Sequence, residues 1–531
     1  MKDASGETRY TRDDAGRLTK LVQGPAGFTE GTNENYKFEA TWNAAGQITQ
    51  KKVTVRTLGA KQGDYAYLDN GALDTVTNPD SEVTDHQWLD DGRIKKIVLA
   101  NGCTRELFYQ DTNDSHAYVA GKNTHLRKTL DKKANGTVIC SFAYELDAAG
   151  NRLGVTDKDG KYTSYGLDPE YQLKSETKWS AKSATATREL QYGYGYDPNG
   201  NRIKLFDDGV QTTSTFGDNN EQLTFGATSL TYDHFGNTTA IGSDAFTWDF
   251  EGHMLTATRG SSIDTHEYNG DSVRMRSKLN NASDWTNFIN DPLESAYPAI
   301  LAEYTLISGT FTIKSVNTHG IGLVNTNREG TKRYFHFDGL GSTWALTDGS
   351  EVVQDTYSWS AFGIQEASTG SSVNPFRYVG QLGYYDETAR GSALGLRLLG
   401  VRYYSPSLGR FLSWDPLGED AERYVYGGNE PTLCIDPLGL FILPLLIIGG
   451  AILIGGCGRQ KPRLRPVWCD EEKHEQCGQM CKSVRSNDQW DSYLTDCLAC
   501  CQEMYPKLRK WCLANCKKLG GNQFLGPCKC S

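Results

Sequence analysis

The sequence lacks the short motifs that mark metal-dependent and nucleotide-dependent enzymes. Its nine histidines are scattered singly, and no His-Glu-x-x-His or comparable ligand spacing occurs. No Gly-x-x-x-x-Gly-Lys run is present to hold the phosphates of a nucleotide. We therefore expect no metal site and no cofactor, and we find no motif specific for nucleic acid.

An export signal is absent from the start of the chain. Residues 1–20 carry charges throughout and have no apolar core of the kind that the export machinery reads. A protein of this kind that leaves its cell would do so without a conventional signal peptide.

Glycine and aromatic residues, in contrast, are abundant. The 531 residues include 56 Gly, 28 Tyr and 11 Trp, and this combination favours β-structure with many tight turns. The chain is too long for one compact core, so we expect at least two units.

The dominant pattern is a repeat. An aromatic residue or Leu is followed by Asp or Asn, two further residues, Gly and a polar residue, at 42–47, 146–153, 196–203, 232–237 and 248–253. Asp and Gly supply turn conformations, so each unit predicts a strand, a turn and a strand. A single hairpin cannot bury its aromatic face, whereas stacked hairpins can. We expect a mainly β shell over residues 1–332, built from hairpins that spiral around a space.

A second repeated motif, Asp-Pro-Leu-Gly, occurs at 415–418 and 436–439. Asp-Pro sequences are typical of turns, in which Pro presets φ and the Asp side chain caps the backbone. Two aspartates that share one site can instead divide their roles, one keeping its proton and the other activating water against a peptide bond. The spacing alone leaves both interpretations open.

Four further segments carry a resemblance to a known family. They are the motifs at 336–343, 374–381, 402–412 and 424–431. Together with the paired Asp-Pro-Leu-Gly, they resemble the core that closes bacterial Rhs and YD-repeat proteins, and the resemblance covers residues 1–440. It implies that the repeats form a closed or partial β-sheet cocoon, and that residues 333–440 form a self-cleaving core domain.

The resemblance also implies residue roles. By position, Asp415 and Asp436 would be the acid/base pair of an aspartic self-protease, Arg410 the orienting cation, and Leu440–Phe441 the bond that is cut. The interval between the first Asp-Pro-Leu-Gly and the second Asp-Pro is 17 residues, one residue shorter than in the family pattern. Whether the two carboxylates lie close enough to share one site is therefore a question for the structure.

An apolar segment follows at 441–458, in which 441–456 reads FILPLLIIGGAILIGG. It is short for a membrane-spanning helix, and Pro444 and two Gly-Gly pairs weaken a helix. Three interpretations stay open: a membrane-inserting segment, a plug packed inside the shell, or a buried linker.

The remaining residues, 459–531, are rich in cysteine, and 11 of the 14 cysteines lie at or after Cys457. This density predicts a disulfide scaffold of short helices, with zinc binding as the alternative. Residues 441–531 have a net charge of +5, against −15 for the rest of the chain. We identify no catalytic set here. The candidate disulfide residues are Cys469, Cys477, Cys481, Cys497, Cys500, Cys501, Cys512, Cys516, Cys528 and Cys530.

These observations support two hypotheses about function. In the first, the chain is a polymorphic toxin whose shell encloses and releases a cysteine-rich effector, with an immunity protein and a delivery apparatus as partners. In the second, it is a non-cleaving surface adhesion protein anchored through residues 441–456. The tail bounded by the cleavage motif favours the first hypothesis.

Overall fold

The computed structural model describes residues 2–3, 6–109, 125–417 and 423–440, with the backbone of Leu443–Ile448 and Ala451–Ile454. The chain divides into two units, Met1–Arg459 and Gln460–Ser531. All the described residues belong to the first unit. Phe441, the predicted cysteine-rich domain and its candidate disulfides lie outside the described residues.

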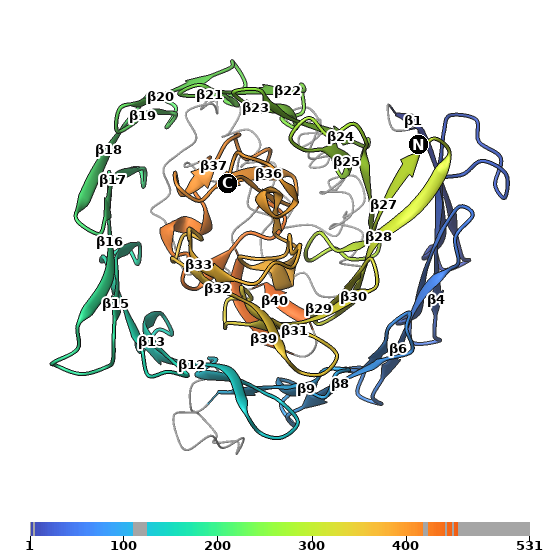
Figure 1. Cartoon of the computed structure of the whole chain (residues 1–531), viewed down its shortest axis with the longest axis horizontal. Coiled ribbons are helices and arrows are strands. Elements are labelled where there is room, and N and C mark those ends of the chain that lie inside the picture. The colour runs from blue at the N-terminus through green and yellow to red at the C-terminus, as the bar shows by residue number, and fades with distance from the viewer. Residues whose placement is uncertain are drawn as a thin grey trace, which may run out of the picture. The chain divides into compact units, whose positions relative to one another are not determined.

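The described residues are dominated by one sheet of 33 strands. Each strand from β1 to β33 pairs antiparallel with the next strand along the chain. Figure 1 shows the strands following one another around a ring as far as β25, after which the last strands turn inward, so that β29–β33 lie inside the ring. The expected mainly β, hairpin-built shell is therefore confirmed.

The first 17 strands are β1 (Lys2–Asp3), β2 (Gly6–Arg12), β3 (Leu18–Gly24), β4 (Tyr36–Trp42), β5 (Ile48–Val55), β6 (Lys61–Tyr67), β7 (Leu73–Thr77), β8 (Val83–Trp88), β9 (Ile94–Val98), β10 (Thr104–Phe108), β11 (Lys128–Lys132), β12 (Val138–Leu146), β13 (Arg152–Asp157), β14 (Tyr162–Leu167), β15 (Leu173–Trp179), β16 (Arg188–Tyr196) and β17 (Arg202–Asp207).

The sheet continues with β18 (Val210–Phe216), β19 (Gln222–Phe225), β20 (Thr228–Tyr232), β21 (Thr238–Ile241), β22 (Asp244–Trp248), β23 (Met254–Arg259), β24 (Ser262–Tyr268), β25 (Arg274–Lys278), β26 (Thr286–Asn290), β27 (Ile300–Ile307), β28 (Thr310–Gly320), β29 (Gly322–Arg328), β30 (Thr331–Phe337), β31 (Thr343–Thr347), β32 (Val353–Trp359) and β33 (Gln365–Thr369). The sheet thus runs past residue 332, where the sequence places the start of the core domain.

The turn between β12 and β13 shows why the repeat has its sequence. The Oδ1 atom of Asp147 accepts hydrogen bonds from the backbone N–H groups of Ala149 and Asn151, both at 2.9 Å. Its Oδ2 atom accepts from Asn151 Nδ2 at 2.8 Å. Gly150 has a φ of 95°, a conformation that favours glycine. One carboxylate therefore satisfies most of the polar groups that the turn exposes.

The repeat aromatics connect each hairpin to the hairpin before it. The Nε1 atom of Trp248 donates to the carbonyl of Thr238, and the hydroxyl of Tyr196 donates to the carbonyl of Leu173 at 2.8 Å. Each ring also covers apolar surface, since both Tyr196 and Trp248 pack against the main core cluster. The repeat aromatic thus joins neighbouring hairpins through packing and through one hydrogen bond.

Strands from the first third of the chain lie against strands from the last part of the sheet. Arg105 donates to the carbonyl of Phe337 at 2.6 Å, and Asp131 Oδ2 lies 3.0 Å from His336 Nδ1 in a fully buried pair. The two groups of strands also share one apolar cluster, which includes Ile94, Ile97, Leu107, Phe142, Val324, Tyr334 and Ala345.

A buried carboxylate joins β15 to the β32–β33 region. Glu176 has a side chain that is 1% exposed, and it accepts a hydrogen bond from the Ala361 N–H at 2.8 Å. Lys178 lies 3.9 Å from Glu176 and is paired with Glu366. Burial raises the pKa of Glu176 to about 7; Lys178 opposes this shift and Glu366 adds to it.

The residues after β33 form a tightly packed core that shares its main apolar cluster with the repeat strands. Four short strands pair in sequence: β34 (Tyr385–Asp386), β35 (Arg397–Leu399), β36 (Arg402–Ser405) and β37 (Arg410–Phe411). Short 3₁₀ helices η1 (Gly380–Leu382), η2 (Glu387–Arg390) and η3 (Gly427–Asn429) and strand β38 (Cys434–Ile435) complete this core. In Figure 1 these orange elements lie inside the ring of strands.

This core is held against turns of the repeat strands. Asn429 Nδ2 donates to the carbonyl of Gly200, and the hydroxyl of Tyr424 donates to the carbonyl of Gly236, both at 2.7 Å. The two carbonyls belong to the glycines of two repeat turns. Seven tyrosines of the core are almost completely buried: Tyr378, Tyr384, Tyr385, Tyr403, Tyr404, Tyr424 and Tyr426.

The apolar run begins as a β-hairpin. Strand β39 (Leu443–Ile448) pairs with β38 and with β40 (Ala451–Ile454). None of the helices within the described residues has the length and the apolar character needed to cross a membrane.

Candidate active site

The two predicted aspartates meet at one side chain. Arg402 Nη2 lies 3.0 Å from Asp415 Oδ2 and 2.9 Å from Asp436 Oδ2. The two carboxylate oxygens are thus no more than about 6 Å apart, the sum of these distances. The exposed fractions are 4% for the Arg402 side chain, 9% for Asp415 and 1% for Asp436. Residues 21 positions apart in the sequence therefore share one buried cation.

The tight approach of two segments positions Arg402. The turn between β35 and β36 contains Gly400, whose φ is 57°. A Cβ atom there would lie 2.1 Å from the carbonyl oxygen of Leu438, so only glycine allows this contact. The next residue, Val401, donates its N–H to the same carbonyl at 3.1 Å. The segment before the predicted cleavage site therefore lies directly against β36.

Arg402 also binds the backbone on both sides of the carboxylates. Its Nη1 atom donates to the carbonyl of Arg423 at 3.1 Å, and its Nε atom donates to the carbonyl of Gly439. The guanidinium lies over the ring of Phe411, 3.7 Å from the centroid. The planar guanidinium of Arg402, with five N–H donors, can bind these carboxylate and carbonyl oxygens together, whereas the ammonium group of a lysine has only three donors.

Asp436 is fixed through its backbone and its side chain. Its N–H donates to the hydroxyl of Tyr384 at 2.8 Å, and this hydroxyl lies 3.0 Å from that of Tyr426. Burial, and then the Asp436 carboxylate, raise the pKa of Tyr384 well above its ordinary range, so this hydroxyl keeps its proton. The Oδ1 atom of Asp436 accepts from the N–H of Leu440 at 2.9 Å. The carboxylate is thus bound to the residue that precedes the predicted scissile bond.

Asp415 begins the first Asp-Pro-Leu-Gly turn. Its Oδ1 atom accepts from the N–H of Leu417 at 2.9 Å, and its own N–H donates to the carbonyl of Arg423 at 3.0 Å. The sequence left open whether Asp415 caps a turn or shares a site with Asp436, and in the structure Asp415 does both.

Arg410, the cation expected from the resemblance, lies at the shell turns. It donates to the carbonyl of Asn220 at 2.7 Å and lies over the rings of Tyr424 and Phe216. The cation found between the carboxylates is Arg402. The sequence had indicated Arg402 only as the first residue of the Arg-Tyr-Tyr-Ser-Pro motif, with no role attached.

Comparisons with known proteins agree with this architecture. Residues 170–423 match the family model described as Teneurin YD-shell. The tRNA3(Ser)-specific nuclease WapA of Bacillus spizizenii is 29% identical over 279 residues, which are 49% of this chain and 11% of that protein. The toxin protein Tse5 of Pseudomonas aeruginosa is 39% identical over 123 residues, which are 22% of this chain and 8% of that protein.

The chain is an Rhs-type YD-repeat protein. Among solved structures, this YD-repeat chain resembles the crystal structure of TcdB2-TccC3 without its hypervariable C-terminal region, with a TM-score of 0.64 and 17% identity. That match covers 82% of this chain and 24% of the other, and at this identity it shows the fold alone. The YD-repeat chain spans about a tenth of the length of the two curated relatives.

Proposed function

We propose that this YD-repeat chain is a toxin carrier that cuts itself after Leu440 and so releases the residues that follow. The observation that carries the proposal is the position of two aspartates on one arginine beside the backbone of Gly439 and Leu440. Curated relatives named as a nuclease and as a toxin support the toxin part of the proposal.

The arrangement suits the hydrolysis of a peptide bond. Two carboxylates that share one arginine can divide their roles, one carrying a proton while the other is ionised. The Leu440 N–H favours the ionised form of Asp436. We therefore assign Asp436 as the base that takes a proton from water, and Asp415 as the acid that donates to the Leu440 carbonyl oxygen. The resulting hydroxide attacks the carbonyl carbon. The bond to Phe441 then breaks as Asp436 gives its proton to the leaving amine, and Asp415 takes a proton back from a hydroxyl of the tetrahedral intermediate, which becomes the carboxyl group of Leu440.

Arg402 takes the role of the orienting cation in this proposal. It contacts both carboxylates and holds the Gly439 carbonyl. Arg410 would act by fastening the core to the shell, since it reaches the carbonyl of Asn220 in a repeat turn.

The released part would begin with the apolar strands β39 and β40 and include the cysteine-rich residues. Its action on a target cell, through a membrane or otherwise, belongs to those residues. An immunity protein and a delivery apparatus are the partners that such a toxin requires.

Mass spectrometry of the purified protein tests the proposal. We expect a fragment that ends at Leu440 and its complement beginning at Phe441. Asp415→Asn and Asp436→Asn should each leave the chain intact.

Asp197→Asn is the matched control, because Asp197 lies in a repeat turn and Asn43 occupies the same position of another repeat. This variant should be cut like the wild type. Intact wild-type chain would contradict self-cleavage and favour the non-cleaving binding protein.

A further inference from the structure

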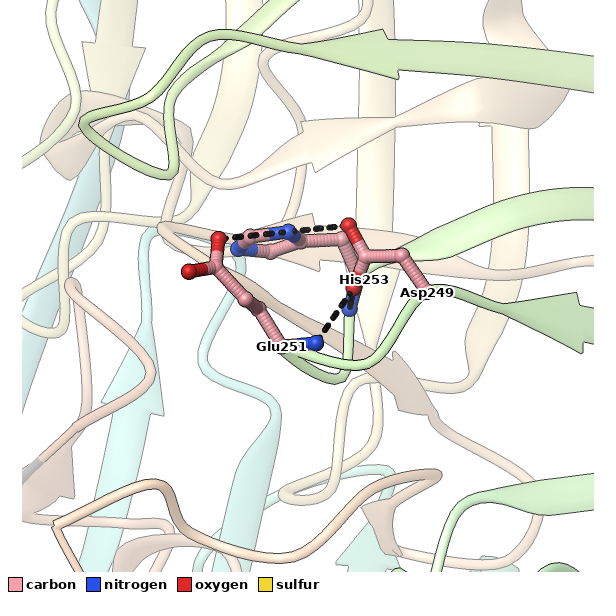
Figure 2. Close-up of side chains that lie close together, drawn as sticks. All are labelled: Asp249, Glu251 and His253. Atoms are coloured by element: carbon pink, nitrogen blue, oxygen red, sulfur yellow. Dashed lines mark hydrogen bonds and ion pairs between the residues drawn. The ribbon is translucent and has the colours of Figure 1, made fainter.

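The turn between β22 and β23 brings together three side chains that can bind a metal ion. They are Asp249, Glu251 and His253, and one ligand atom from each lies within 4.8 Å of the other two. The Nδ1 atom of His253 is 2.8 Å from Asp249 Oδ2 and 3.9 Å from Glu251 Oε2. Figure 2 shows both carboxylates reaching the ring of His253. We expected no metal site from the sequence, because these residues follow the repeat pattern and match no known ligand spacing.

Comparison with other repeat turns of the same chain shows how the turn at 249–253 differs from them. At the position of His253, three turns carry asparagines whose Nδ2 atoms donate to the turn aspartate: Asn151, Asn201 and Asn237. An asparagine satisfies the turn but offers no imidazole nitrogen to a metal ion. At the position of Glu251, some repeats carry alanine, as at Ala45 and Ala149, and others a carboxylate, as at Asp159 and Glu170. Those two carboxylates are followed two residues later by Lys161 and Gln172, so the imidazole beside two carboxylates distinguishes the turn at 249–253.

Two of the three ligands are held in place before any ion binds. Asp249 Oδ1 accepts from the N–H groups of Glu251 and His253, both at 2.9 Å, which leaves Oδ2 directed at the imidazole. The ring of His253 stacks on Tyr268 with centroids 4.7 Å apart and planes 17° apart. The Glu251 side chain is 42% exposed, so an ion can reach the cluster from solvent.

We propose that Asp249, Glu251 and His253 form a binding site for a zinc-class divalent ion. An imidazole with two carboxylates suits zinc better than calcium or magnesium, which take oxygen ligands. Zinc–ligand bonds of about 2.0–2.2 Å place ligand atoms roughly 3–3.5 Å apart. Closing the site therefore requires mainly a shift of about 1 Å by the exposed Glu251. A metal ion bound at Nδ1 requires the ring proton of His253 to be on Nε2. Three protein ligands leave a coordination position for water.

Zinc titration of the full chain by calorimetry tests this site. His253→Asn is a close test variant, since asparagine occupies the same position in three other turns and preserves the hydrogen bond to the aspartate. Glu251→Ala is the second variant, because alanine is found at its position in other repeats. Both variants keep all 14 cysteines, so zinc bound by thiols contributes equally to every titration.

We expect the wild-type chain to bind one zinc ion more than His253→Asn, and Glu251→Ala to bind that ion at least tenfold more weakly. Cobalt at this site should give visible absorption without a sulfur-to-metal band. Equal zinc uptake and affinity in the wild type and in both variants would overturn the proposal, and His253 would then only replace asparagine as a hydrogen-bond donor. Circular dichroism melting of the variants verifies that they fold.

Discussion

Replacing Arg402 is the sharpest test of the carboxylate site. The side chain is 4% exposed and contacts two carboxylates, two backbone carbonyls and the ring of Phe411. Arg402→Leu leaves both carboxylates buried without their cation. Removing one partner of a buried ion pair typically costs about 3–5 kcal/mol, and we expect a loss of this order in the free energy of unfolding. Self-cleavage should stop.

Arg402→Lys separates the role in cleavage from the role in folding. Lysine keeps the charge but is a point donor without the planar fork. It cannot reach Asp415, Asp436 and the Gly439 carbonyl in the same geometry. We expect most of the stability to remain and the cleavage rate to fall by about 10²–10³-fold, the range seen when one positioned donor is lost. The assay is the appearance of the fragment ending at Leu440 after refolding from denaturant.

The pH dependence adds a second readout for Arg402→Leu. Without the Arg402 cation, the two carboxylates repel each other most when both are ionised, and protonation relieves this repulsion. The destabilisation should therefore be larger at pH 8 than at pH 5, as measured by urea unfolding of chains that end at Leu440, which keep both carboxylates and have no bond left to cut. Wild-type cleavage by Arg402→Lys, or an equal loss of stability for Arg402→Leu at both pH values, would refute the reasoning.

Three further predictions concern single residues. Glu176→Gln should raise the free energy of unfolding at pH 8 by up to about 3 kcal/mol and change it little at pH 5. The pKa of Glu176 is raised from 4.5 to about 7 in the folded protein, so the wild type has its full stability below pH 4.5 and loses part of it as the pH rises through 7. Denaturant titrations at both pH values will show the difference. Gly400→Ala should abolish the cleavage fragment on a gel, since its Cβ would meet the Leu438 carbonyl at 2.1 Å, whereas Gly395→Ala, with φ 71° and nothing within 4 Å, should still be cut. Tyr384→Phe leaves the buried N–H of Asp436 without its acceptor, which costs about 1–3 kcal/mol of stability. It should slow cleavage about tenfold in a refolding time course. An unchanged rate would show that this hydroxyl does not position the site.

The shell could be predicted because its information is local. Asp147, Gly150 and Asn151 form their turn from five consecutive residues, and such a unit has the same sequence signature each time. Repetition of the signature indicated hairpins in series, and the 33-stranded antiparallel sheet follows from it. The strands between 261 and 327, where the repeats weaken, continue the sheet because each pairs with the strand before it.

The role of Arg402 could not be predicted in the same way. Its partners Asp436 and Gly439 are 34 and 37 residues away, and no local pattern connects them. Arg410 is much nearer to Asp415 in the sequence, but it lies on β37, where it reaches the shell carbonyl of Asn220. The resemblance indicated Arg410 by its position in the motif, whereas the pairing of β35, β36 and β37 places Arg402 in contact with both carboxylates.

Self-cleavage by this site must follow the folding of the shell. The carbonyl of Arg423 contacts Arg402 and the backbone of Asp415, and the next residue, Tyr424, is fixed by the Gly236 carbonyl of a shell turn. Asn429, between the two aspartates, is fixed by the Gly200 carbonyl of another turn. The chain that links the two carboxylates thus takes its conformation partly from hairpins about 200 residues earlier. A chain whose shell has not formed lacks these acceptors, so the aspartates have no common position beside Leu440. The proposed cut therefore requires that the hairpins carrying Gly200 and Gly236 have folded against the core.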